Sequence, residues 1–304
     1  MEKILITGGS GTIGKAFIRN FPQYKYYNIS RNEKSLTDLL REFPKVKNHI
    51  GNIEDKNFLI RIFKNIKPDI VIHAAAMKHV DIVETNPIQA CNVNVMGSLN
   101  VIYASIAADV PVTIGISTDK ACSSESVYGD TKSLMEKCFT EANTKQNKFA
   151  LCRFANVAHS NGSVLPFWLK LHKQKTPLKL TSDKMGRLMF SQDDAANLIH
   201  KTINKCGKDG GGFICSYKMK SVNMLDLAKT ISSFITIVGL RPGEKLNEDL
   251  ISKKEIDYTY IEDDMIYIYK DKNPNNNKLS KGYSAFTAEK MSTKEMKKLV
   301  WGKK

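Results

Sequence analysis

A glycine-rich turn between the first strand and the first helix limits the fold more than any other segment. The apolar run KILIT (3–7) leads into GGSGTIG (8–14), in which three glycines recur at a spacing of three residues. Glycine lets the backbone turn sharply and approach a pyrophosphate, which then lies on the N–H groups of the helix N-terminus. The turn therefore predicts a dinucleotide site. Its candidate ligands are Gly8, Gly11, Thr12, Ile13 and Gly14.

Apolar runs and helical patterns alternate after this turn. Leu36, Leu39 and Phe43 recur at helical spacing, and a similar pattern follows from Phe58 to Ile66. The further strands expected are 24–30, 46–51, 69–75, 112–118 and 149–157. Strands that alternate with helices imply right-handed crossovers and a parallel sheet covered on both faces. The sequence thus predicts an α/β fold with a doubly wound parallel sheet of the Rossmann type.

The pattern loosens after about residue 160, which suggests a second unit. We expect residues 1–160 to form the dinucleotide-binding domain and residues 161–304 to form a smaller substrate-binding lobe. Residues 187–215 are expected to return to the first domain. The elements expected in this half are a helix in 162–176, a strand at 177–182, a capped helix at 191–205 and an exposed loop at 270–282.

The formal net charge of +15 raises the question of a nucleic-acid partner. The lysines, however, are spread along the chain and are not gathered into blocks interleaved with aromatic residues, so the charge is typical of solvated faces. A positive field would also help to hold an anionic nucleotide. We therefore expect no nucleic-acid partner.

Cysteine usage and hydropathy indicate the compartment. The six cysteines form no C-x-x-C pair and have no neighbouring histidine pairs, so we expect no metal site and no disulfide framework. No apolar run approaches the roughly 18 residues of a membrane span, and the opening MEKILITGG does not resemble a signal peptide. A cytoplasmic protein without a membrane partner is expected.

The end of the second expected strand distinguishes NAD from NADP. An acidic residue there would bind the ribose 2′-hydroxyl, but the segment SRNEK (30–34) presents a hydroxyl and two cations. Arginine binds a phosphate dianion with paired donors, so Ser30, Arg31 and Lys34 favour NADP. The alternative is a solvent-exposed strand end, with Glu33 as an acidic candidate out of position.

Two further segments are candidates for contact with the cofactor. In GNIED (51–55), Asn52 could bond the adenine and Ile53 could pack on it. The alanines that follow the fourth expected strand would leave room for the cofactor, although simple tight packing explains them equally well. These alanines are Ala74, Ala75 and Ala76.

Candidate catalytic residues cluster in STDKACSSESVYGDTK (117–132). Tyr128 and Lys132 are four residues apart and share a helix face. A tyrosine with a pKa near 10 is a poor base, but a nearby ammonium and an oxidised nicotinamide would lower that pKa. The phenolate could then take the proton of a sugar hydroxyl that Thr118 orients. Tyr128 and Lys132 are expected to contact the cofactor as well.

Asp119 and Lys120 are additions that a simple dehydrogenase or epimerase does not need. A 4,6-dehydratase needs both, because oxidation at C4 makes the C5 proton acidic and the C6 hydroxyl must then leave. Lys120 could remove the C5 proton and Asp119 could protonate the departing oxygen, before hydride returns to C6. An exposed Asp–Lys turn pair explains the residues without function.

The chain resembles the extended short-chain dehydrogenases/reductases, and among them the soluble, inverting UDP-N-acetylglucosamine 4,6-dehydratases of surface-polysaccharide and flagellin-glycan synthesis. The similar segments span nearly the whole chain: ILITGGSGTIGKAF, VIHAAAMKHVDIVETNPIQACNVNVMGSLNV, ISTDKA, VYGDTKSLMEK, RFANVAHSNGSVLPFW and GLRPGEKLNEDLIS. The resemblance implies the catalytic roles given above, a UDP-sugar substrate in the smaller lobe, a homo-oligomer and reprotonation of C5 from the opposite face.

The resemblance also assigns residues to the substrate. Lys78 would lie near the sugar, and Asn156 near the nucleotide. Arg187 and Arg241 would hold the diphosphate, and Glu244 the uridine ribose. The turn formed by Gly162, Ser163 and Val164 would also meet the nucleotide end. A capping asparagine, a helix-opening turn and solvated arginines are the alternatives.

Three departures from the family pattern limit what the resemblance implies. Asn52 replaces an acid that often contacts adenine, and Gly186 replaces a threonine, which makes the placement of Arg187 less certain. Membrane-linked relatives that retain configuration carry methionine in place of Tyr128, so this chain resembles the soluble group. No residue identifies the 2-acetamido group of the sugar.

Two competing functions remain open. A UDP-sugar 4-epimerase or 4-keto reductase would use Tyr128 and Lys132 but would gain little from Asp119 and Lys120. A non-catalytic nucleotide-sensing or nucleic-acid-binding protein on the same fold is suggested by the charge, and the intact catalytic pattern argues against it.

Overall fold

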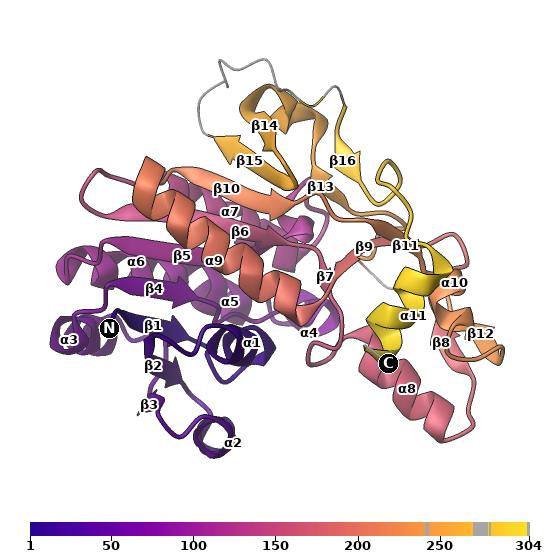
Figure 1. Cartoon of the computed structure of the whole chain (residues 1–304), viewed down its shortest axis with the longest axis horizontal. Coiled ribbons are helices and arrows are strands. Elements are labelled where there is room, and N and C mark those ends of the chain that lie inside the picture. The colour runs from indigo at the N-terminus through magenta and orange to yellow at the C-terminus, as the bar shows by residue number, and fades with distance from the viewer. Residues whose placement is uncertain (241–242, 270–278, 280, 303–304) are drawn as a thin grey trace.

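The main body of the protein is a nine-stranded sheet, shown by a computed structural model that describes residues 1–240, 243–269, 279 and 281–302 (Figure 1). The strands lie in the order β14-β15-β10-β6-β5-β4-β1-β2-β3. Their bounds are β1 (Lys3–Thr7), β2 (Lys25–Ser30), β3 (Lys47–Ile50), β4 (Ile70–His73), β5 (Val112–Thr118), β6 (Lys148–Phe154), β10 (Phe213–Tyr217), β14 (Thr259–Glu262) and β15 (Met265–Tyr269). The strands from β10 to β3 are parallel, and β15 and β14 continue the sheet antiparallel. The doubly wound α/β fold predicted from the sequence is confirmed.

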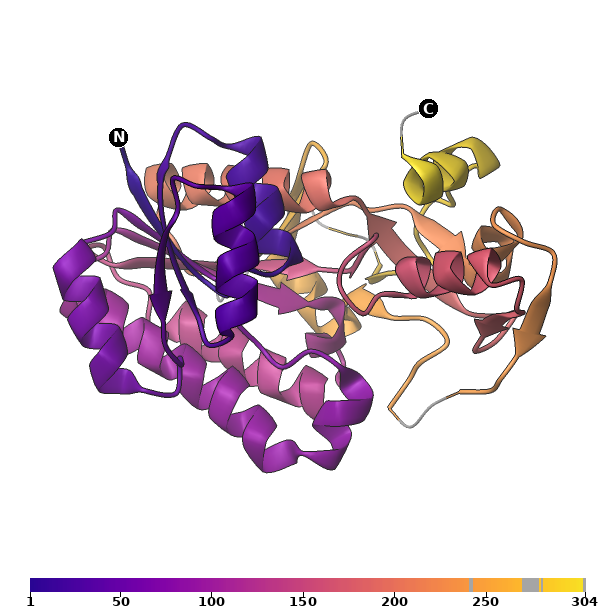
Figure 2. The same ribbon diagram turned by 90° about the horizontal axis from the view of Figure 1, so that it is seen from below.

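Helices cover both faces of this sheet. α1 and α9 pack together on one face, and α3, α6 and α7 lie on the other (Figure 2). The bounds of these helices are α1 (Thr12–Asn20), α3 (Lys56–Ile66), α6 (Gly97–Ala107), α7 (Val127–Glu141) and α9 (Gln192–Asp209). The other helical segments of this body are α2 (Glu33–Glu42), α4 (Val80–Thr85), α5 (Pro87–Ala90), the π-helix η1 (Cys91–Met96) and the 3₁₀ turns η2 (Asp119–Ala121) and η3 (Lys253–Tyr258).

Local sequence explains where these helices begin and which face they bury. Leu59, Phe63 and Ile66 lie three or four residues apart on α3, so they form one apolar stripe that packs in the core beneath β1 and β4. α9 begins with a capping box, in which the Ser191 side chain accepts from the Asp194 N–H while the Asp194 carboxylate accepts from the Ser191 N–H. The capped helix expected at 191–205 is therefore present.

A second hydrophobic cluster forms the core of a smaller lobe. It is centred on Trp168, Leu178, Leu227 and Val300, all almost fully buried. The elements around it are β7 (Asn156–Val157), α8 (Val164–Lys173), β8 (Leu178–Leu180), β9 (Gly186–Phe190), β11 (Ser221–Asn223), α10 (Met224–Lys229), β12 (Ile235–Ile237) and α11 (Thr293–Trp301). An antiparallel pair of β13 (Asp249–Ile251) and β16 (Tyr283–Ser284) lies between the lobe and the main sheet (Figure 1).

The structure corrects three of the sequence expectations. The strand expected at 149–157 breaks at Ala155, because the chain leaves β6 there and β7 pairs with β9 in another sheet. Within 187–215, α9 and β10 join the main body, but β9 pairs with β7 and β11 in the lobe. β14 and β15, expected in the lobe, extend the main sheet because β15 pairs with β10.

In the part of the chain that the structure describes, no helix is long and apolar enough to cross a membrane. The exposed loop expected at 270–282 lies mostly outside the described residues.

Candidate active site at the carboxyl edge of the sheet

The glycine turn after β1 brings two chain segments into close contact. Gly8 has a φ of +75°, and a Cβ atom on it would lie 2.8 Å from the backbone N of Ala75. A Cβ on Gly14 would lie 2.4 Å from the Cα of Gly9. α1 starts after Gly11 without a side-chain cap, so its first N–H groups face the turn unprotected. This cradle fits a dinucleotide pyrophosphate at the N-terminus of α1.

The remaining predicted residues of this turn lie beside it. The Thr12 hydroxyl accepts a hydrogen bond from the Asn161 N–H at 3.1 Å, which connects the turn to the segment before α8. Ile13 is partly buried against the main core. Ala74 and Ala76 flank Ala75 immediately after β4, and the backbone of Ala74 and Ala75 lies against Gly8.

The end of β2 carries a cluster of hydroxyl groups. The Ser10 Oγ lies 2.9 Å from Ser30 Oγ and 3.1 Å from Ser35 Oγ. Arg31 and Lys34 are exposed next to this cluster. The end of β2 therefore presents hydroxyl groups with two exposed cations beside them. Ser10 and Ser35 were not identified from the sequence, because only the fold brings them to Ser30.

The segment expected to bind adenine is arranged differently from the prediction. The Asn52 amide donates to Glu54 Oε2 at 2.5 Å, so one of its donors is engaged within the turn. Ile53 is 5% exposed and packs against α6, where a Cβ on Gly97 would lie 2.6 Å from its Cδ1. Its side chain therefore serves mainly the core and leaves little surface for a base.

Thr118, Tyr128 and Lys132 come together where β5 ends and α7 begins. The α7 N-terminus is fixed by Ser126, which accepts from the Gly129 N–H, and by Glu84, whose Oε1 accepts from the Val127 N–H at 2.7 Å. The Tyr128 side chain is hydrogen-bonded to the Thr118 side chain.

The electrostatics of Tyr128 differ from the expectation. Burial and the nearby Asp119 carboxylate raise the pKa of Tyr128 above its ordinary value, although the hydrogen bond with Thr118 opposes this. The Lys132 ammonium donates to the Ile116 carbonyl at 2.7 Å, and burial lowers the pKa of Lys132 to about 8. The protein alone therefore holds a neutral phenol, and the charge that favours a phenolate is left to a bound cofactor.

Asp119 and Lys120 form an ion pair beside Thr118, in which the carboxylate is buried and the lysine side chain is 23% exposed. The Thr118 hydroxyl donates to Asp119 Oδ1 at 2.9 Å, and the Lys120 Nζ lies 3.2 Å from the same oxygen. Asp119 is fully buried, and its Oδ2 has no hydrogen-bond partner among the described residues. A buried carboxylate oxygen without a partner is costly, so its place at the carboxyl edge indicates a ligand. An exposed turn pair, the alternative considered from the sequence, is excluded by this burial.

A third residue of this cluster was missed in the sequence. Glu248 is 3% exposed and its Oε1 lies 3.5 Å from the Lys120 Nζ. Burial lowers the pKa of Lys120, but the Asp119 and Glu248 carboxylates more than offset this and raise the pKa above its usual value. No periodic pattern marks Glu248 in the polar segment LNEDLIS, so only the fold could identify it.

The predicted sugar and nucleotide residues lie around the start of α8. Lys78 Nζ donates to the Asn161 carbonyl at 2.7 Å, and burial lowers the pKa of Lys78. Ser163 is the N-cap of α8, yet its side chain makes no cap hydrogen bond. Its Oγ is buried and has no partner in the described part of the chain. The first turn of α8, which begins with Val164, is thus open to an anionic ligand.

The other residues near this turn hold the backbone. Gly162 has a φ of +75°, and a Cβ on it would lie 2.2 Å from Cε1 of His79. The Asn156 amide donates to the Leu188 carbonyl at 3.1 Å across β7 and β9. This bond gives Asn156 a structural role across the two strands, which differs from the capping role considered from the sequence.

Arg187 and Glu244 are engaged with each other. Arg187 is 6% exposed, donates to the carbonyls of Lys245 and Leu246, and forms an ion pair of 3.7 Å with Glu244. Arg187 was expected at the diphosphate and Glu244 at the ribose; in the structure two hydrogen bonds of Arg187 also hold the loop before β13. Arg241 lies outside the described residues.

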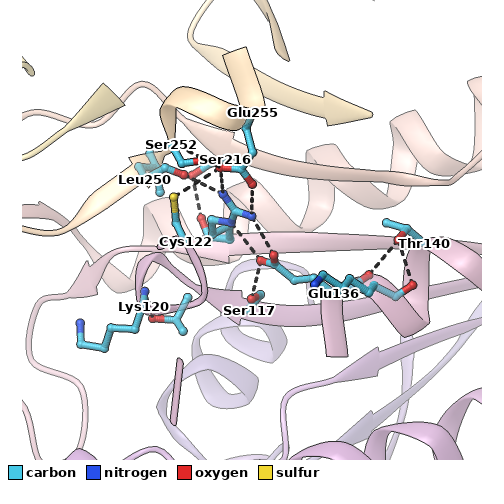
Figure 3. A network of polar contacts seen from close by, with 12 residues as sticks. Ser117, Lys120, Cys122, Glu136, Thr140, Ser216, Leu250, Ser252 and Glu255 are labelled. Carbon is cyan, nitrogen blue, oxygen red and sulfur yellow. Dashed lines mark hydrogen bonds and ion pairs between the residues drawn. The ribbon is translucent and has the colours of Figure 1, made fainter. Parts of the chain in front are cut away.

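A buried ionic network lies directly beneath the site, and the sequence did not reveal it. Arg153, at the end of β6, forms ion pairs of 2.7 Å with Glu136 of α7 and 2.8 Å with Glu255 of η3. It also donates to the Leu250 carbonyl at 2.8 Å. Figure 3 shows Glu136 and Glu255 approaching this centre from opposite sides, with Ser117 below.

Asn94 is a further residue that sequence reasoning missed. It is fully buried in the π-helix η1, accepts from the Met77 N–H at 2.8 Å and donates to the Thr131 hydroxyl at 3.1 Å. It thereby fixes the segment that carries Lys78 to the helix that carries Tyr128. Single π turns within helices often occur at functional sites.

Comparisons with known proteins agree with this geometry. A family model described as polysaccharide biosynthesis protein matches residues 4–270. The UDP-N-acetylglucosamine 4,6-dehydratase (inverting) of Campylobacter jejuni is 36% identical over 85% of this chain and 80% of its own length. The UDP-glucose 4-epimerase of Rickettsia canadensis is 32% identical over 84% of this chain and 79% of its own length. In the X-ray structure of Pen from Bacillus thuringiensis, the matching chain is 30% identical with a TM-score of 0.90, over 98% of this chain and 96% of that one.

Proposed function

Because the chain belongs to the polysaccharide biosynthesis protein family of extended short-chain dehydrogenases/reductases, we propose that it is a UDP-N-acetylglucosamine 4,6-dehydratase that inverts C5. The family resemblance drawn from the motifs is confirmed. The proposed product is a UDP-2-acetamido-2,6-dideoxy-L-hexos-4-ulose for surface-glycan synthesis. The observation that carries the proposal is the Asp119–Lys120 ion pair next to Thr118, in which the carboxylate is buried and one of its oxygens has no partner among the described residues.

The first step belongs to Thr118 and Tyr128. The Thr118 hydroxyl would orient the O4 hydroxyl of a sugar, and the Tyr128 phenolate would take its proton. When bound, NADP would supply the hydride acceptor for C4 and the hydride donor for C6. Lys132, buried and held on the Ile116 carbonyl, would contribute positive charge beneath the tyrosine.

Water loss belongs to Asp119 and Lys120. Elimination requires a free amine and a carboxylic acid, whereas the resting pair is an ammonium and a carboxylate. One proton that moves from Lys120 Nζ to Asp119 Oδ1, over 3.2 Å, produces both required forms. Lys120 then takes the C5 proton while Asp119 donates its proton to O6, and the C6–O6 bond breaks to release water.

Substrate binding falls on the lobe side of the site. The unpartnered Ser163 hydroxyl and the uncapped first turn of α8 offer donors for the diphosphate. Lys78, whose Nζ contacts the carbonyl just before Gly162, would add positive charge near the sugar. For the cofactor we propose NADP, supported by Arg31 and Lys34 beside the hydroxyls around Ser30.

We also propose that the protein acts in the cytoplasm as a homo-oligomer. Exposed apolar side chains on the outer helices support assembly through helix faces, notably Tyr103 and Ile106 of α6 and Leu134 of α7. Light scattering after size-exclusion chromatography tests this, and a monomer at all concentrations would contradict it.

Incubation with several UDP-hexoses tests the function. With UDP-N-acetylglucosamine and NADP we expect a product lighter by one water in mass spectrometry, and proton NMR should show the inverted configuration at C5. A product of unchanged mass would instead support the 4-epimerase, which the Rickettsia relative favours. Turnover with NAD but not NADP would contradict the proposed cofactor.

A further inference from the structure

The Lys120 ammonium is bound by two buried carboxylates from different parts of the chain. Asp119 is its neighbour in sequence, and Glu248 reaches it from the segment before β13, at 3.5 Å. Elimination needs only one acid and one base, so the second carboxylate is left without a task. We infer that Glu248 is a positioning residue that holds and charge-balances Lys120 during water loss, an inference that rests on the proposed function.

Glu248 is held rigidly. Its carbonyl accepts from the Ala285 N–H at 3.1 Å, and β13 pairs with β16 and packs on η2. Two residues further on, the Leu250 carbonyl accepts from Arg153, which also binds Glu136 of the catalytic helix α7. Figure 3 shows Leu250 at this junction. The segment that carries Glu248 is thereby fixed to the elements that carry the other reacting groups.

The proton inventory shows why a second carboxylate is useful. When Lys120 gives its proton to Asp119, both groups become neutral. As the C5–H bond breaks, its electron pair forms the C5–C6 double bond and the proton forms a new N–H bond on Lys120, while Asp119 gives its own proton to O6 and becomes a carboxylate again. Glu248 takes part in neither transfer, so its carboxylate faces Lys120 before, during and after water loss.

The charged groups facing Lys120 decide the pH dependence. They are Asp119 on the same turn, Glu248 before β13 and Arg187 of β9, of which the arginine opposes the two acids. Replacing Glu248 by the uncharged, equally large glutamine removes one of the two charges that stabilise the ammonium. The pKa of Lys120 should fall, because the protonated form loses a partner within about 4 Å.

The experiment compares Glu248→Gln with wild type in two assays. For water loss from UDP-N-acetylglucosamine, we expect kcat to fall about tenfold, KM to change less than about twofold, and the rising limb of the pH profile to move down by about one pH unit. C4 oxidation, followed as reduced cofactor in single turnover, should persist. Glu248→Asp keeps the negative charge, so the rising limb of its pH profile should stay at the wild-type position. Asp249→Asn is the matched control and should catalyse water loss at the wild-type rate.

Three outcomes would overturn the inference. Glu248→Gln could catalyse water loss from the substrate at the wild-type rate, with the rising limb of its pH profile unchanged. Glu248→Gln could instead slow C4 oxidation and water loss equally, with an unshifted pH profile and a lower melting temperature, which would show a structural role only. The same conclusion would follow if Glu248→Asp slowed water loss as much as Glu248→Gln, with a normal melting temperature and an unshifted pH profile. If wild type removes no water from any UDP-hexose, the proposed function fails, and this inference fails with it.

Discussion

At the scale of the residue, the unpartnered oxygen of Asp119 leads to a clear division of labour. Asp119→Asn keeps the shape but removes the acid, so water loss should fall at least about 100-fold. Oxidation at C4 should persist, because Thr118 and Tyr128 remain in place. Mass spectrometry of the products and absorbance of the reduced cofactor separate the two reactions.

Two companion variants complete this test. Lys120→Ala should also stop water loss and leave some C4 oxidation, whereas Tyr128→Phe should suppress both reactions. If Lys120→Ala dehydrates at the normal rate, the role given to this lysine is wrong.

Single residues were also where the sequence was least informative. Thr118, Asp119, Lys120 and Tyr128 could be recognised because they are close in the chain and follow one strand. Glu248 could not, because more than a hundred residues separate it from Lys120 and only the packing of β13 on η2 brings them together. The sequence also could not show that Arg187 donates hydrogen bonds to the carbonyls of Lys245 and Leu246.

At the scale of the element, the turn between β1 and α1 should tolerate no added methyl group. A Cβ on Gly14 would lie 2.4 Å from the backbone of Gly9, so Gly14→Ala should cost about 1–3 kcal/mol of unfolding free energy. It should also weaken binding of the dinucleotide cofactor, because the turn must shift. Urea unfolding and cofactor titration measure the two effects.

Gly207 provides the matched control for this change. It lies within α9, where the nearest atom to an added Cβ is 4.0 Å away. Gly207→Ala should therefore stabilise the protein by up to about 1 kcal/mol through helix propensity. Equal effects of the two substitutions would contradict the close approach at the turn.

The Arg153 network joins β6, α7 and η3, and its loss should be costly. Arg153→Met leaves the Glu136 and Glu255 carboxylates without their buried cation, so we expect about 3–5 kcal/mol less stability in urea at neutral pH. Arg19→Met removes an exposed pair with Glu42 and should cost under about 1 kcal/mol.

The pH dependence of this network has a definite sign. Burial raises the pKa of Glu255, but Arg153 and the Ser252 hydrogen bonds more than offset this and lower the pKa to about 2 from 4.5. A carboxyl with a lowered pKa stabilises the fold above its unfolded pKa, and this contribution is lost as the pH falls towards the folded value. The difference in unfolding free energy between wild type and Arg153→Met should thus become smaller from neutral pH to about pH 3. A difference that stays constant with pH would contradict a stabilising ion pair between Arg153 and Glu255.

The order of elements was largely predictable because each signal is local. Buried parallel strands read as apolar runs, and the capping box at Ser191 marks the start of α9. The break between β6 and β7 at Ala155 was not predictable, since both segments are apolar and differ only in the strands they pair with. The antiparallel extension by β14 and β15 likewise depends on pairing with β10, which lies about fifty residues earlier in the chain.

At the scale of the whole molecule, the lobe and the main body should unfold together. Both tryptophans of the chain belong to the lobe, with Trp168 in its core and Trp301 at the end of α11. Fluorescence therefore reports the lobe, whereas far-UV circular dichroism reports all helices. Because Arg153 and Lys120 bind residues of the segment that connects the two units, we expect the two urea midpoints to coincide. Different urea midpoints for fluorescence and circular dichroism would show that these contacts do not couple the unfolding of the lobe to that of the main body.

The two outermost strands of the sheet have a consequence for self-association. β3 and β14 each span only four residues, and β3 opens with Lys47. Short edge strands that carry a charged side chain disfavour the addition of a further strand from a neighbouring molecule. Copies of this chain should accordingly meet through their helical surfaces, and the hydrogen-bonded ladder should end within each subunit.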